Sequence, residues 1–212
     1  MGELSRESEI YRVTIVGSIV NFMLLVFKFV AGVLGHSAAM VADAVHSLSD
    51  FVTDIIVIVF VRISSKPADS THGYGHGKFE TLATTIVGCV LLCVGIGICV
   101  NGVSDIIGVF RGELQPAPSM IALVAAAVSI LFKEVLYQYT LFKGKNLCSQ
   151  AVIANAWHHR SDAFSSIGAL LGIGGAVLGG DRWRVLDPVA AVVVSLFIVK
   201  VAISILKNSL DE

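Results

Sequence analysis

The chain has 212 residues, of which 55% are hydrophobic and 15% are charged, and its formal net charge is -1. A soluble domain of this size could not bury so much apolar surface, because a large share of any small fold faces water. A net charge near zero also excludes a protein that binds nucleic acid through a basic surface. The composition therefore predicts an all-α membrane protein in the lipid bilayer, with little chain left for a soluble domain.

Six long apolar stretches follow one another, and each is long enough to cross a bilayer as a helix. The third is longer than a span requires and should tilt or project past the bilayer. The sixth opens with Asp187 and Pro188, a capping residue followed by a first-turn proline. We expect a six-transmembrane-helix bundle with helices at about 10–34, 37–63, 79–110, 118–142, 149–179 and 187–207.

The basic residues at the membrane edges are divided unevenly between the two ends of this predicted bundle. The end that holds both termini has eight, namely Arg6, Arg12, Arg62, Lys66, Lys78, Lys143, Lys145 and Lys207. The other end has three, Arg111, Arg182 and Arg184. Lys and Arg accumulate on the cytoplasmic side of membrane proteins, so both termini are predicted to be cytoplasmic. Short connections and the lack of a targeting segment fit a multi-pass protein of a bacterial inner (cell) membrane.

The second stretch carries four ionisable residues that fall on one face of a helix. They are Asp43, His46, Asp50 and Asp54, at spacings i, i+3, i+7 and i+11. A charge near the centre of a bilayer costs a few kcal/mol, so this face must turn toward the bundle interior or toward water.

The fifth stretch repeats the pairing of the second, because His158 and Asp162 are four residues apart, as are His46 and Asp50. Each histidine lies about nine residues into its stretch, and the two stretches run antiparallel, so both pairs reach a similar depth. Two imidazoles and two carboxylates form a full tetrahedral set for Zn²⁺. The alternative is hydrogen bonding or ion pairing between the helices without a metal.

The other charges within the spans receive different interpretations. Asp43 and Asp54 lie outside the matched pairs and are predicted to be structural or to line the pathway. Arg160 is expected to balance an acidic side chain in the bundle. Side chains that extend toward the span ends are expected for Lys28, Lys133, Glu134 and Lys200.

The connection between the second and third stretches contains a proline and several glycines and is predicted to be a flexible loop. Its Asp69, His72 and His76 could form a second, looser metal site, because glycines let the backbone bring them together. Histidines that are simply solvated are the alternative.

These segments together resemble the cation diffusion facilitator family, which includes zinc transporters. The resemblance spans all six helices and rests on ADAVHSLSD (42–50), PADSTHGYGHGKFE (67–80), HHRSD (158–162), LDPVAA (186–191) and NSLDE (208–212). It implies a homodimer that exports a divalent metal in exchange for protons. Zn²⁺, with Cd²⁺ or other divalent cations as further possibilities, would be the transported substrate rather than a cofactor.

The resemblance also assigns roles to residues. It implies an intramembrane metal site of His46, Asp50, His158 and Asp162, and it supports the loop site of Asp69, His72 and His76. Lys78 and Asp211 match positions that form a charge interlock near the cytoplasmic dimer contact. Members with His at the position of His46 are similar to zinc and cadmium transporters, whereas manganese-type members have Asp or Asn there.

Most family members continue into a cytoplasmic ferredoxin-like metal-binding domain, and this chain ends at Glu212, where that domain would begin. We therefore expect residues 1–212 to be a transmembrane domain alone. A non-transporting metal sensor or scaffold, which would keep the site and lose the flux, is the alternative function. We do not expect an enzyme, because a metalloenzyme needs an open metal position and a base, and the chain contains no His-Glu-x-x-His motif.

Overall fold

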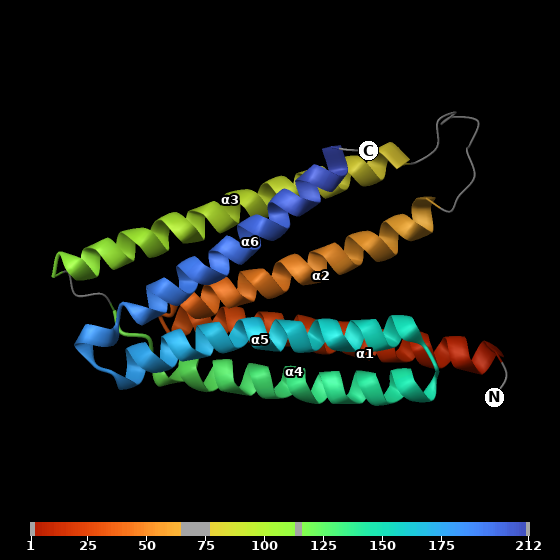
Figure 1. Ribbon diagram of the computed structural model, residues 1–212, viewed down its shortest axis with the longest axis horizontal. Helices are drawn as coiled ribbons and strands as arrows, with labels where there is room; N and C mark the ends of the chain where they lie inside the picture. Colours follow the sequence, from red (N-terminus) through yellow and green to blue (C-terminus); the bar gives the residue numbers. More distant parts are fainter. Residues whose placement is uncertain (1–2, 65–76, 113–115, 211–212) are drawn as a thin grey trace.

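The computed structural model describes residues 3–64, 77–112 and 116–210, which are helical throughout apart from short connections. Six α-helices run along the long axis of the molecule (Figure 1). A short 3-10 turn, Asp181–Trp183, precedes the last of them. The α-helices are α1 (Glu3–Leu34), α2 (Ala38–Ser64), α3 (Gly77–Phe110), α4 (Met120–Asn146), α5 (Gln150–Leu178) and α6 (Leu186–Leu210).

The six predicted helices are confirmed, and the largest difference is at the start of α1. This helix begins at Glu3 rather than near residue 10. The polar first turns are held against the α4–α5 connection, because Arg6 Nε donates to the carbonyl of Leu147 over 2.8 Å. One turn later Glu9 Oε2 lies 3.4 Å from Lys143 Nζ. Polar contacts therefore extend the helix beyond its apolar part.

Within the described part of the chain, five helices are long and apolar enough to cross a membrane. α2 carries three aspartates, Asp43, Asp50 and Asp54. α2 packs against α1 on one side and α6 on the other, with further contacts to α3 and α5 (Figure 1). Asp43 and Asp50 are therefore placed inside a helix bundle, where a purely apolar helix is not required.

The helices pack as two groups (Figure 1). In one group α1 packs against α2 and α4, and α4 packs against α5. In the other group α3 packs against α6, and α6 joins the groups through its contacts with α2 and α5. α1 begins and α6 ends at the same end of the molecule, as six passes along the long axis require (Figure 1).

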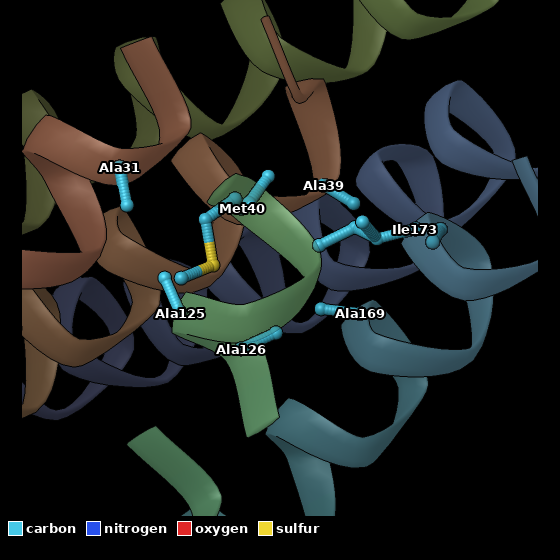
Figure 2. Packing of buried hydrophobic residues seen from close by; sticks show 9 residues of the cluster. Ala31, Ala39, Met40, Ala125, Ala126, Ala169 and Ile173 are labelled. Atoms are coloured by element: carbon cyan, nitrogen blue, oxygen red, sulfur yellow. The ribbon is translucent and has the colours of Figure 1, made fainter. Parts of the chain in front are cut away.

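Small side chains hold the first group together near the turn from α1 to α2 (Figure 2). Met40 and Ile173 are the large members of this buried cluster, and both are almost fully enclosed. Alanines allow membrane helices to approach closely and pack without voids. The remaining members are all alanines, at positions 31, 39, 122, 125, 126, 169 and 190.

Asp187 lies in the first turn of α6, as predicted, but its carboxylate binds the start of another helix. It accepts hydrogen bonds from Ser37 Oγ at 2.6 Å and from the backbone N–H of Ala38 at 2.7 Å. The first N–H groups of a helix have no partner within the helix and favour a negative charge. Asp187 therefore caps α2 from α6 and ties together two helices that are distant in sequence.

Candidate metal site

Three of the four predicted metal ligands converge between α2 and α5. Asp50 comes from α2, and His158 and Asp162 come from successive turns of α5. Each offers a ligand atom that lies within 4.8 Å of the other two. His and carboxylate atoms at such separations can close on one metal ion after small side-chain rotations.

The fourth predicted ligand, His46, lies one turn before Asp50 on α2. Its Nε2 is 3.9 Å from Asp50 Oδ2, and His158 Nδ1 is likewise 3.9 Å from Asp162 Oδ1. His46 Nδ1 and Asp50 Oδ2 are buried and have no hydrogen-bond partner among the described residues. A buried acceptor without a partner is costly, and a bound cation would remove that cost. We call His46, Asp50, His158 and Asp162 the ligand quartet.

All four members of the ligand quartet line one large cavity of about 840 Å³. Its other walls are mostly apolar side chains of α5 and α6, among them Phe164, Leu171 and Phe197, with Ser161 and Ser165 on α5. The quartet thus forms most of a small polar patch at the wall of a largely apolar space. A hydrophilic ion in this cavity would be held at the quartet, because most of the polar atoms that could bind it belong to these four residues.

On its far side, the quartet meets a lysine of α4. Lys133 Nζ lies 3.2 Å from Asp162 Oδ2, and its side chain is only 4% exposed. The prediction that Lys133 extends to the end of its span is therefore wrong. The apolar sequence around it gave no sign of the pairing, which depends on α4 packing against α5.

The same prediction is wrong for Lys28 of α1, which is fully buried. Its Nζ lies 2.7 Å from Asp43 Oδ2 and donates to Ser166 Oγ over 3.0 Å and to Ser47 Oγ over 3.3 Å. Ser166 Oγ in turn donates to Asp43 Oδ1 over 2.9 Å. Asp43 thus forms an ion pair with α1 and a hydrogen bond with α5. Of the two predicted roles, structural or pathway-lining, this is the structural one. Glu134 and Lys200 keep at least partial exposure.

The HHRSD segment distributes its side chains around α5. His159 is buried against α1, where its Nδ1 lies 3.5 Å from Asn21 Nδ2. Arg160 donates to Tyr137 Oη of α4 over 3.1 Å, and its guanidinium lies 4.7 Å from the centre of the Tyr137 ring. The expectation that Arg160 balances an acidic side chain is not met: its neighbours are aromatic, and a cation–π contact replaces the ion pair.

The remaining predicted site residues cannot be placed. Asp69, His72, His76 and Asp211 lie outside the described residues. Asp54 and Lys78 lie in α2 and α3, but their side chains lie outside the described set. The loop metal site and the Lys78–Asp211 interlock therefore stay predictions.

Comparison with known proteins agrees with the helical membrane fold. Residues 14–212 match the family described as Cation efflux transmembrane domain. The manganese efflux system protein MneP of Bacillus subtilis is 35% identical over 210 residues, which cover 97% of this chain and 69% of that protein. Metal tolerance protein C1 of Arabidopsis thaliana is 39% identical over 89% of this chain and 42% of its own length.

A third relative extends the range of organisms. The magnetosome protein MamB of a Magnetospira strain is 36% identical over 88% of this chain and 61% of its own length. The helices identify a multi-pass integral membrane protein, and bacterial relatives such as MneP support the predicted cell-membrane location. With a family match over almost its whole length, the chain belongs to the cation diffusion facilitators, a family of cation efflux transporters.

Proposed function

We propose that this protein exports Zn²⁺ from the cytoplasm in exchange for protons, with the ligand quartet as its transport site. The observation that carries the proposal is the convergence of Asp50, His158 and Asp162 within 4.8 Å, with His46 beside them. Two imidazoles and two carboxylates suit Zn²⁺ better than the harder ion Mn²⁺, which prefers oxygen ligands.

The spacing of the quartet is compatible with binding and release of an ion. Ligand atoms at about 2.1 Å from a tetrahedral Zn²⁺ lie about 3.4 Å from one another. The His46–Asp50 and His158–Asp162 atom pairs are both 3.9 Å apart, so each pair has to close by only about 0.5 Å. Because one pair is on α2 and the other on α5, relative motion of these two helices would make or break the site.

Proton exchange follows from the chemistry of the ligands. A metal binds neutral histidine and ionised aspartate, so binding releases protons and protonation releases the metal. Histidine changes its charge near neutral pH, which makes His46 and His158 suitable proton carriers. Protons taken up on the outer side would expel the ion there, and their release on the cytoplasmic side would reset the site.

Mn²⁺ is the second candidate cargo. Its support is the 35% identity to MneP, whose name states manganese efflux. The two candidates make opposite demands on the first ligand position, because oxygen ligands suit Mn²⁺ and imidazole suits Zn²⁺. His46 favours Zn²⁺, and direct competition between the two ions decides between them.

The state and setting of the transporter are part of the same proposal. We infer a homodimer with both termini in the cytoplasm, from the resemblance to the family and the basic residues at that end. Asp69, His72 and His76 would then bind metal on the cytoplasmic side, and Lys78 with Asp211 would lie near the dimer contact.

The test is uptake of Zn²⁺ by proteoliposomes under an imposed pH gradient. Wild-type protein should accumulate Zn²⁺, and Asp50→Ala should lose at least about tenfold of the rate, because it removes one of the two carboxylate ligands. Asp181→Asn is the control: this aspartate lies in the α5–α6 connection with its side chain 79% exposed and should transport like wild type.

Two results would contradict the proposal. Transport by Asp50→Ala at the wild-type rate would remove the ligand quartet from the mechanism. Binding of Zn²⁺ in detergent without any vesicle uptake would favour the alternative of a non-transporting sensor or scaffold.

A further inference from the structure

A buried cation lies beside the proposed transport site. Lys133 Nζ is 3.2 Å from Asp162 Oδ2, while the other oxygen of the same carboxylate, Oδ1, faces His158 at 3.9 Å. Asp162 therefore divides its two oxygens between a lysine and a candidate metal ligand.

The shape of the interior points to the same arrangement. A second, much smaller cavity of about 10 Å³ is lined by Lys133 together with Asp50, His158 and Asp162. This volume is at the lower limit for a single water molecule. The lysine thus approaches the quartet from α4, while the large cavity opens to the quartet from the side of α5 and α6.

Charge explains why a cation there would matter. Asp50 and Asp162 have their ligand atoms within 4.8 Å, and two carboxylates this close repel each other unless a positive group lies nearby. Lys133 supplies that group when the site is empty. When a divalent ion binds, the same ammonium becomes a neighbouring like charge and competes for Asp162.

We propose that Lys133 is an affinity-setting residue: it neutralises the empty site and weakens the hold on the bound divalent cation, so that the ion is released within each transport cycle. The inference rests on the proposed function, in which the quartet is the transport site. Lys133 is a positioning residue in this scheme and makes no bond to the metal.

Binding of Zn²⁺ and Mn²⁺ to the purified protein, measured calorimetrically at one fixed pH near 8, tests this directly. Lys133→Met keeps an unbranched side chain of nearly the same length and removes its charge, so the Kd for both ions should fall by at least about tenfold. Lys133→Arg keeps the charge and should stay within about threefold of wild type. Transport turnover of the methionine variant should fall, because release becomes slower.

The matched control is Lys28→Met, which removes a second lysine that is buried among the described residues. Lys28 is paired with Asp43 rather than with a member of the quartet, so the Kd should stay within about threefold of wild type. Thermal unfolding gives a second signature. Both methionine variants should unfold at lower temperature without metal, but only Lys133→Met should show a larger stabilisation by Zn²⁺ than wild type.

A Kd that is unchanged or higher in folded Lys133→Met protein would overturn the proposal and leave Lys133 as a purely structural partner of Asp162. Lys133→Gln, which is polar but uncharged, provides the same comparison if the methionine variant does not accumulate. The proposed function is judged separately. Wild-type protein that binds metal without uptake would refute transport, whereas the change in Kd would still decide the role of Lys133.

Discussion

His46 is the member of the ligand quartet at which a change of one side chain should alter metal preference. Its Nε2 is positioned 3.9 Å from Asp50 Oδ2, at the edge of the site. We predict that His46→Asp shifts the ratio of Mn²⁺ to Zn²⁺ uptake upward by about tenfold, because an oxygen ligand replaces an imidazole. Uptake in proteoliposomes with both ions present measures this ratio.

The control for this substitution is His36→Asp. His36 is exposed at the α1–α2 connection and has a backbone φ of 49°, a conformation that aspartate tolerates. Its ratio of Mn²⁺ to Zn²⁺ uptake should equal that of wild type. An unchanged ratio in His46→Asp protein that still transports would show that selectivity is set elsewhere.

The Lys28–Asp43 pair gives a second prediction at the level of single residues. Removing one partner of a buried ion pair leaves an unpaired charge and typically costs about 3–5 kcal/mol. Lys28→Met should therefore lower the free energy of unfolding by about this amount. Lys28→Met combined with Asp43→Asn should recover most of this free energy, because neither position then carries a buried charge. Ser166 also keeps a hydrogen-bond acceptor at position 43. Denaturant unfolding in mild detergent provides the measurement.

The ligand quartet could be predicted because both of its pairs are spaced four residues apart, and this spacing places two side chains on one helix face. Lys133 and Lys28 could not be predicted in the same way. Each binds a carboxylate on a different helix, so its partner is determined by how the helices pack and not by any pattern along the chain. The partner of Arg160 could not be predicted for the same reason, because the aromatic ring of Tyr137 that it contacts comes from α4.

At the level of whole helices, α3 and α6 are in contact along a row of glycines. Gly88, Gly95 and Gly102 are seven residues apart and share one face of α3. A methyl group added at Gly102 would lie 2.7 Å from Val192 Cγ2 and 3.2 Å from the backbone oxygen of Pro188. Small residues at such a contact let the two backbones approach closely.

We predict that Gly102→Leu destabilises the protein by about 1–3 kcal/mol, the typical cost of overpacking a well-filled contact. Gly97→Leu is the matched control, because Gly97 is exposed and a methyl group there meets nothing within 4 Å. Thermal unfolding of the two variants should separate them clearly. Equal melting temperatures would show that the contact between α3 and α6 accepts a large side chain without loss of stability.

The extents of the helices were predicted well in their apolar parts and less well at their polar ends. Hydrophobic length locates a membrane span because each span needs about 20 apolar residues. It does not locate the first turns of α1, which are held by contacts of Arg6 with the α4–α5 connection and of Glu9 with the last turn of α4. Such ends depend on a neighbouring segment and carry little hydrophobic signal of their own.

At the level of the whole molecule, the helix bundle has a tightly packed end near the α1–α2 turn and a polar interior further along α2. The alanine-rich cluster near the α1–α2 turn closes the first group of helices (Figure 2). The Lys28–Asp43 pair and then the ligand quartet follow along α2 toward the other end. The cavity that the quartet lines also extends along α5 and α6 as far as Leu186, at the start of α6. It therefore passes beside the alanine-rich cluster, because Ala190 belongs both to that cluster and to the cavity lining.

Orientation in the membrane can be tested on the same molecule. Ser8 and Lys145 are exposed at the end where α1 begins, and Arg111 and Asp181 are exposed at the opposite end (Figure 1). The native cysteines at 89, 93, 99 and 148 are free, so they must first be replaced. If both termini are cytoplasmic, a membrane-impermeant maleimide should label Arg111→Cys and Asp181→Cys in intact cells. Ser8→Cys and Lys145→Cys should react only after permeabilisation, and the reverse pattern would invert the predicted orientation and, with it, the direction of export.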